Sequence, residues 1–157
     1  MKLYLIRHAQ PKSYEEDPRM PLSDLGQKIM RKISEHAADR MNLVISQIWH
    51  SDKLRAKETA AILAESLGIT DKMKEQKGLG PNDDVFPMQN RLTEVEGNLA
   101  IVGHLPFLSK LASLLLCGRT DAGMIRFETG SIVCLSRDDY DNWTLDWMIT
   151  PDIIGSL

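Results

Sequence analysis

The chain has 157 residues, of which 43% are hydrophobic and 26% are charged, and its net charge at pH 7 is −3. This length and balance predict one globular domain over residues 1–157. A chain without a basic excess is not expected to bind nucleic acid, and no apolar run approaches the roughly 20 residues of a membrane span. The short apolar start runs directly into Arg7 and His8, unlike a signal peptide, so we expect a cytoplasmic protein.

The two cysteines, Cys117 and Cys134, both lie in apolar runs. Because free cysteine is among the most frequently buried residue types, we expect two reduced thiols in the core. A metal pair or a disulfide is the alternative interpretation.

The first quarter of the chain predicts a strand, a loop and a helix. Residues 2–6 form an apolar run typical of a buried strand, and three prolines keep residues 9–21 irregular. Ser23 is the expected N-cap of a helix that runs to about Arg40. The predicted apolar stripe of this helix, spaced by four residues, consists of Leu25, Ile29, Ile33 and Ala37.

The rest of the chain continues the alternation of strands and helices and then ends in strands. The expected elements are a strand over 43–49, a helix ending at Leu67 before Gly68, a short strand over 72–76, a helix over 85–95, a strand over 99–102, a helix from Pro106 to Leu116, and strands over 123–127, 131–136 and 143–149. The last two strands are predicted to form a hairpin. This order indicates a three-layer α/β/α sandwich with a mostly parallel sheet and an antiparallel edge.

Basic and imidazole side chains follow the predicted parallel strands at the points where they end. Arg7 and His8 follow the first strand, Arg55 begins the helix after the second, and His104 follows the strand over 99–102. Ligands of such sheets bind beyond the carboxyl ends of the strands. Guanidinium groups suit a tetrahedral phosphoryl group, so this set favours an anion site. Each of these residues alone also has a structural explanation. Arg55 could be a surface charge paired with Glu58, and His104 could be a buried core histidine.

The segments LIRHA, SDKLRAKET and IVGHLP resemble the three signatures of the histidine phosphatase superfamily, which includes the phosphoglycerate mutases. The short chain, the GHLP context and the closing NWTLDWMITP are most similar to the SixA-type phosphohistidine phosphatases. The resemblance implies a phosphoglycerate mutase-like fold and a metal-independent reaction without a cofactor. It implies that His8 is the nucleophile and forms a phosphohistidine intermediate, while Arg7, Arg55 and His104 hold the phosphoryl oxygens.

The chemistry of the predicted nucleophile agrees with these roles. Attack on phosphorus requires a neutral imidazole with a free lone pair. Two neighbouring guanidinium charges should lower the pKa of His8, and a backbone carbonyl would serve to hold its other ring nitrogen.

The sequence departs from the family pattern at several positions. Ala9 stands where the family often has glycine, so a positive φ there would be strained. The loop of the SixA-type proteins often reads Arg-Pro-Leu-Ser/Thr, whereas here Met20 stands between Arg19 and Pro21. Arg19 is therefore either a third cation of the site or a solvated loop residue. Ser51 either binds phosphate or, in the favoured interpretation, caps the following helix. No clear proton donor is present, since Asp83 and Asp84 are better explained as turn residues than as acids over the site.

The function predicted from these features is removal of phosphate from phosphohistidine on a protein, for example on a histidine-phosphotransfer domain. Residues 9–21 and 77–85 offer little material for a lid, which suits a macromolecular substrate. The alternatives are a small-molecule phosphomonoesterase of the same superfamily and a non-catalytic module that binds phosphate or a phosphoprotein. No nucleic-acid or membrane partner is expected, and the sequence does not require more than a monomer.

Overall fold

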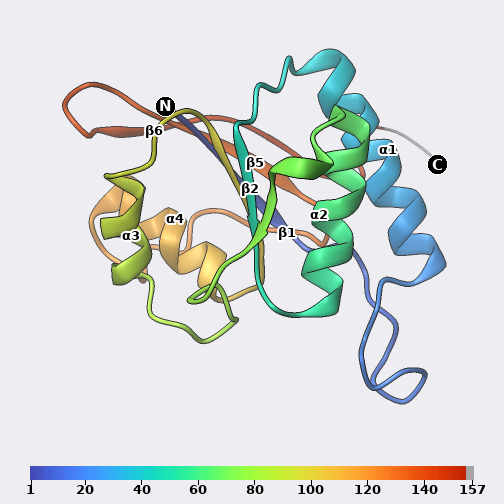
Figure 1. The fold of residues 1–157 in the computed structure, drawn as a ribbon. Coiled ribbons are helices and arrows are strands. Elements are labelled where there is room, and N and C mark those ends of the chain that lie inside the picture. The colour runs from blue at the N-terminus through green and yellow to red at the C-terminus, as the bar shows by residue number, and fades with distance from the viewer. Residues whose placement is uncertain (155–157) are drawn as a thin grey trace.

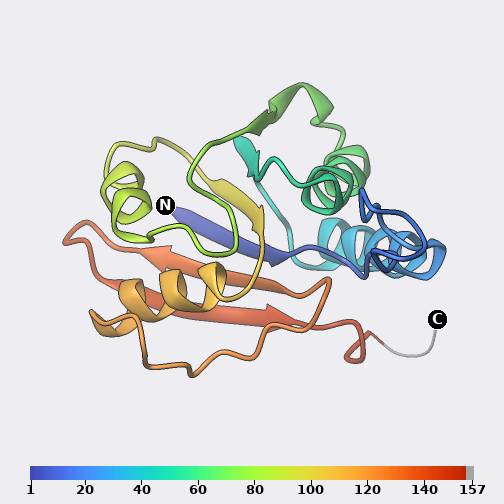
Figure 2. The ribbon, with the colours of Figure 1, turned by 90° about the horizontal axis from the view of Figure 1, so that it is seen from below.

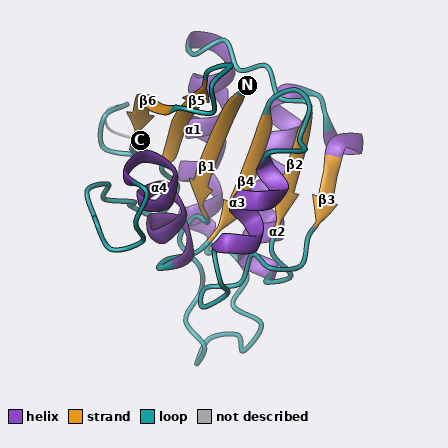
Figure 3. Cartoon of the chain, turned by 90° about the vertical axis from the view of Figure 1, so that its left-hand side faces the viewer, coloured by secondary structure: helices purple, strands orange, loops and turns teal. Residues whose placement is uncertain are grey.

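The structure is a computed structural model and describes residues 1–154. Its centre is a six-stranded sheet of order β3-β2-β4-β1-β5-β6, in which β1 to β4 are parallel and β5 and β6 are antiparallel additions at one edge (Figure 3). The strands are β1 (Lys2–Arg7), β2 (Gln47–His50), β3 (Met73–Glu75), β4 (Leu99–Gly103), β5 (Ile132–Arg137) and β6 (Trp143–Ile149). The predicted parallel sheet with an antiparallel edge is therefore confirmed.

Helices cover both faces of this sheet, which gives three layers (Figures 1 and 2). The helices are α1 (Asp24–Arg40), α2 (Leu54–Leu67), α3 (Phe86–Leu92) and α4 (Phe107–Cys117), with a short 3-10 turn, η1 (Thr70–Lys72). Side chains of β1 alternate between the two cores, because successive residues of a strand point to opposite faces. Tyr4 and Ile6 pack in the core that contains α1 and α2, whereas Leu3 and Leu5 pack in the core that contains α3 and α4.

Three predicted helix boundaries have a visible physical cause. The Ser23 hydroxyl accepts a hydrogen bond from the Gly26 N–H at 2.9 Å, which caps α1 as expected. Gly68 and Gly118 follow α2 and α4 with φ of 69° and 74°. Residues without a side chain adopt this left-handed conformation freely, so both glycines end their helices.

The predicted strand over 123–127 is wrong, because these residues form a loop. The sheet ends at β3 and β6 without them, and the loop lies beside the end of β1, where it contacts Arg7. Met124 is 61% exposed, while Phe127 is buried and its carbonyl accepts from Arg7. The second predicted strand also differs, since β2 begins at Gln47 and includes His50.

Two expectations about burial are corrected. Leu25 is 52% exposed, because the buried face of α1 is shifted by one residue to Gly26, whose absent side chain lets the helix approach the Gln10 carbonyl. Cys134 is buried as predicted, but Cys117 is exposed at the last position of α4. Among the described residues no helix is long and apolar enough to span a bilayer.

Candidate functional site

The four residues with predicted chemistry meet at the carboxyl ends of the parallel strands. Arg7 ends β1 and pairs in register with Gly103, so that His8 and His104 follow adjacent strands. The two imidazole rings lie with their centroids 5.1 Å apart and their planes at 51°. Arg55 lies in the first turn of α2, directly after β2. Because β2, β4 and β1 are neighbours, residues separated by almost 100 positions share one edge of the sheet.

His8 is held by its own backbone surroundings. Its N–H donates to the Gly103 carbonyl at 3.0 Å, and its ring Nδ1 lies 2.8 Å from the Ala9 carbonyl oxygen. A carbonyl only accepts, so Nδ1 carries the proton and Nε2 keeps its lone pair. Burial lowers the pKa of His8 to about 4, opposed by the bond to Ala9 and assisted by Arg55 and Arg7. Burial thus outweighs the guanidinium charges that the sequence suggested as the cause.

The two arginines present different environments. One terminal nitrogen of Arg7, Nη1, donates to the Phe127 carbonyl at 2.7 Å, whereas its Nε is buried and has no partner among the described residues. Burial lowers the pKa of the half-buried Arg55. The alternative pairing of Arg55 with Glu58 does not form, because that carboxylate accepts from the Leu22 N–H at 2.8 Å.

His104 is nearly inaccessible, with 2% of its surface exposed. Its Nε2 lies 2.6 Å from the hydroxyl oxygen of Ser51, and its Nδ1 is buried and unpartnered within the described residues. Burial, followed by the nearby His8 and the cations Arg55, Lys53 and Arg7, lowers the pKa of His104 to about 3. The expectation that Ser51 caps α2 is wrong, because the N-cap is Lys53 and the Ser51 hydroxyl contacts His104 instead.

Thr59, which the sequence analysis did not single out, ties two parts of the site together. Its buried hydroxyl donates to the Arg55 carbonyl at 2.7 Å and accepts from the Ala9 N–H at 3.0 Å. The sequence does place Thr59 one helical turn after Arg55, and residues with this spacing lie on the same face of a helix. This spacing was the one signal that could have pointed to Thr59. Ala9 does not have positive φ, since the described non-glycine residues with positive φ are Met20, Asn42 and Asp141. Its replacement of glycine therefore introduces no backbone strain.

The structure does not bring Arg19 into this cluster. Its side chain is 76% exposed, and its guanidinium pairs with the Asp17 carboxylate at 2.9 Å, within the loop after β1. Asp83 and Asp84 accept backbone hydrogen bonds from Gly80 and Phe86, at 2.7 and 3.1 Å. Both aspartates therefore serve as turn residues, as the favoured interpretation predicts.

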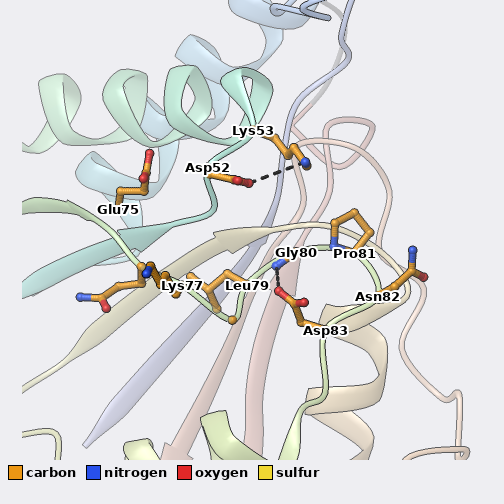
Figure 4. Close-up of a pocket in the computed structure, with 11 residues that line it drawn as sticks. Asp52, Lys53, Glu75, Lys77, Leu79, Gly80, Pro81, Asn82 and Asp83 are labelled. Carbon is orange, nitrogen blue, oxygen red and sulfur yellow. Dashed lines mark hydrogen bonds and ion pairs between the residues drawn. The ribbon is translucent and has the colours of Figure 1, made fainter.

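Two hollows lie near the cluster, and only the second includes one of its four residues in its wall. One, of about 440 Å³, lies beyond the ends of β2 and β3 and includes Lys53, Lys77 and Asp83 in its wall (Figure 4). The other, of about 460 Å³, is bordered by Arg7, Leu105 and the loop over 123–128. Across residues 1–154 there is no group of three or more histidine, cysteine or acidic side chains that would hold a metal ion.

Comparisons with known proteins identify the family and the fold. Residues 3–80 match the family model of the histidine phosphatase superfamily (branch 1). None of the curated proteins matches the sequence. Among solved structures, the protein histidine phosphatase SixA complexed with tungstate is 22% identical with a TM-score of 0.87, covering 99% of this chain and 100% of its own.

Two further structures share the fold. The alpha-ribazole phosphatase from Shigella flexneri is 16% identical with a TM-score of 0.78, and the match covers 96% of this chain and 97% of that one. A mycobacterial glucosyl-3-phosphoglycerate phosphatase is 18% identical with a TM-score of 0.72, over 92% and 96% of the two chains. At these identities the solved structures establish a common fold, and the match to the family model establishes the family. The chain belongs to the histidine phosphatase superfamily.

Proposed function

We propose that this phosphatase removes phosphate from phosphohistidine on a protein, using His8 as the nucleophile. The observation that carries the proposal is a pair of buried nitrogens beside His8, Arg7 Nε and His104 Nδ1, which have no partner among the described residues. Leaving a buried donor unpaired costs about 1–3 kcal/mol. Oxygens of a phosphoryl group would supply acceptors for the Arg7 N–H and, in the Nδ1-protonated form, for His104.

The proposed reaction has two displacements. The Nε2 lone pair of His8 attacks phosphorus, and the electrons of the breaking P–N bond leave with the substrate imidazole. Water then attacks the phosphorus of the phosphorylated His8, the electrons of the P–Nε2 bond return to Nε2, and the proton lost by the water leaves with inorganic phosphate or passes to solvent. This restores the neutral ring, which keeps its proton on Nδ1 throughout. Arg7, Arg55 and His104 stabilise the charge on the equatorial oxygens, so that catalysis rests on positioning and electrostatics.

The environment of the site supports a P–N substrate. No carboxylate among residues 1–154 is hydrogen-bonded or ion-paired to the four clustered residues. Asp83, Asp84 and Glu58 are already engaged by backbone N–H groups. A phosphoester releases an alkoxide that needs a positioned acid, whereas an imidazole leaving group needs less help.

The loops around the site support a macromolecular substrate. The segment over 9–21, blue in Figure 1, extends away from the sheet, and the segment over 77–85 is a short turn-rich connection. Neither supplies a helix or a sheet that would enclose a small molecule. A phosphohistidine side chain presented by a folded partner, such as a histidine-phosphotransfer domain, would reach His8 without displacing a lid.

A substrate comparison tests the proposal. Hydrolysis rates are measured on a phosphohistidine-bearing histidine-phosphotransfer domain, p-nitrophenyl phosphate and 3-phosphoglycerate. We expect kcat/KM to be highest for the phosphohistidine protein. A strong preference for either small phosphoester would contradict the assignment and favour the second candidate, a small-molecule phosphomonoesterase.

That second candidate is favoured by one observation, the hollow of about 440 Å³ beside Lys53 (Figure 4), which has room for a small leaving group. It predicts a basic limb in the pH–rate profile that reports an essential acid. The remaining alternative, a non-catalytic binding module, predicts neither turnover nor a phosphoenzyme trapped by acid quench.

A further inference from the structure

The contact between Ser51 and His104 lies one layer behind the proposed phosphoryl site. Ser51 is 1% exposed and follows β2, and its N–H donates to the Val102 carbonyl at 3.3 Å. The side-chain oxygen lies 2.6 Å from His104 Nε2. Since Val102 and His104 belong to the same stretch of chain, both the backbone and the side chain of Ser51 bind the segment that carries the imidazole.

The other hydrogen bond of Ser51 indicates the direction of the contact. The Lys53 N–H donates to the Ser51 oxygen at 3.3 Å, so one lone pair of the hydroxyl is already occupied. The hydroxyl proton has no other acceptor among the described residues, and the imidazole nitrogen is the nearest. The separation of 2.6 Å is also shorter than the usual 2.9–3.0 Å of N–H donors and suits an O–H donor.

We propose that Ser51 is a positioning residue of the phosphoryl site. By donating its hydroxyl proton to Nε2 of His104, it fixes the ring as the tautomer that carries a proton on Nδ1. Nδ1 is the buried atom without a partner in the described part of the chain, and it then becomes a hydrogen-bond donor to a phosphoryl oxygen. The catalytic use of this donor rests on the proposed function, whereas the tautomer itself does not.

The opposite tautomer would work against the site. If Nε2 donated to Ser51, the lone pair on Nδ1 would face the bound anion, and a lone pair repels a phosphoryl oxygen. Protonation of both nitrogens is also disfavoured, because the ring is buried and lies near Arg55, Lys53 and Arg7. By fixing this tautomer, Ser51 makes the neutral His104 ring a hydrogen-bond donor in a place where a further positive charge would be unfavourable.

The first measurement is the tautomer, read from ¹⁵N chemical shifts of the histidine rings in the unliganded wild-type protein. The chain has four histidines, so the His104 signals are assigned by comparison with the His104→Asn variant. We expect a protonated, pyrrole-like Nδ1 and a pyridine-like Nε2 at neutral pH. A proton on Nε2 would overturn the proposal before any variant of Ser51 is made.

The second measurement uses Ser51→Ala, with Ser51→Thr to restore the hydroxyl and Ser66→Ala as the matched control. Ser66 lies at the far end of α2 from Ser51, and its hydroxyl donates to the Ile62 carbonyl. We expect Ser51→Ala to shift the His104 tautomer and to weaken inorganic phosphate binding by about 10- to 100-fold, the range for a hydrogen bond to a charged group. Ser51→Thr should recover most of this loss, and Ser66→Ala should bind phosphate as wild type does.

The outcomes separate this inference from the proposed function. An unchanged tautomer and unchanged phosphate affinity in Ser51→Ala would refute the positioning role. If Ser51→Ala and Ser51→Thr weaken phosphate binding equally, the hydroxyl is not responsible and the role is also refuted. A wild-type protein that fails to hydrolyse phosphohistidine but shows the expected ring shifts would contradict the proposed function alone.

Discussion

His8 donates the proton on its Nδ1 to the carbonyl oxygen of the next residue, Ala9, across 2.8 Å. The reactive ring is thus oriented by the peptide that follows it, and the Ala9 N–H is in turn bound by the Thr59 hydroxyl. This chain of two hydrogen bonds leaves Nε2 as the free lone pair. The backbone after β1 therefore determines which ring nitrogen of His8 is free to act as the nucleophile.

Replacement of His8 tests the nucleophile directly. We expect His8→Ala to lower kcat by about 1,000-fold or more, since loss of a nucleophile leaves only binding and electrostatic stabilisation. Acid quench after mixing with ³²P-labelled substrate should trap phosphoenzyme in the wild type and none in the variant. The control is His36→Ala, which replaces a histidine within α1 and should keep wild-type turnover. A near-normal rate for His8→Ala would exclude it as the nucleophile.

The pH dependence should report the buried state of His8. Burial lowers the pKa of this ring to about 4, so the neutral nucleophile persists well below neutral pH. We expect kcat/KM to stay level from pH 7 to about 5 and to fall as His8 gains a proton near its lowered pKa. Arg55→Gln removes a nearby positive charge, and the acid limb should move to higher pH.

The position of that limb, rather than the rate, is the measured quantity, because Arg55 also contacts the phosphoryl group in the proposed mechanism. Arg31→Gln removes a cation from the surface of α1 and should leave the limb unchanged. An Arg55→Gln limb at the wild-type pH would mean that this guanidinium does not act on His8.

The sequence predicted that these residues would converge, because their positions follow from topology. In a parallel sheet the carboxyl ends of adjacent strands meet, so Arg7, His8 and His104 had to converge once β1 and β4 were neighbours. The hairpin of β5 and β6 was equally local, since its strands are joined by a short polar turn. Patterns that depend on one element or on one rule of connection are visible in a single chain.

The errors concern contacts that depend on packing between elements. The segment over 123–127 was predicted as a strand, but it pairs with none of the six strands and instead provides the Phe127 carbonyl that accepts from Arg7. Ser51 is suitable as a cap by type and position, but its hydroxyl binds His104 from another strand. Thr59 belongs to no recognised motif, and its hydrogen bond to the Ala9 N–H forms only because the loop after β1 packs against α2.

Thr59→Val should separate the role of its hydroxyl from that of its shape. Valine keeps the volume but leaves the buried Ala9 N–H without an acceptor, which costs about 1–3 kcal/mol. We expect the free energy of unfolding to fall by this amount in urea titrations. The kcat should also fall, because the Ala9 carbonyl that orients His8 loses its support. Thr59→Ser should restore both quantities, and equal behaviour of valine and serine would contradict the role of the hydroxyl.

Ala9→Gly tests whether the departure from the family pattern matters. Ala9 is 1% exposed and lacks positive φ, so glycine relieves no strain and adds conformational freedom to the unfolded chain. We expect a loss of stability of about 0.5–1 kcal/mol and little change in KM. A large gain in kcat/KM would mean that the methyl group obstructs the phosphoryl site, contrary to the geometry.

Arg19→Gln distinguishes a loop ion pair from a substrate contact. The Arg19 side chain is 76% exposed and pairs with Asp17 two residues earlier, so its removal takes no donor away from the clustered residues. Exposed pairs are worth about 0–1 kcal/mol, and we expect Arg19→Gln to change stability and turnover of p-nitrophenyl phosphate only slightly. Arg7→Gln, which removes the partly buried cation at the end of β1, should reduce turnover of that substrate by orders of magnitude. If Arg19→Gln loses turnover only with the phosphohistidine protein, Arg19 contacts the partner outside the phosphoryl site. If turnover falls equally with both substrates, Arg19 leaves Asp17 and joins Arg7 on the phosphoryl group, which would contradict this prediction.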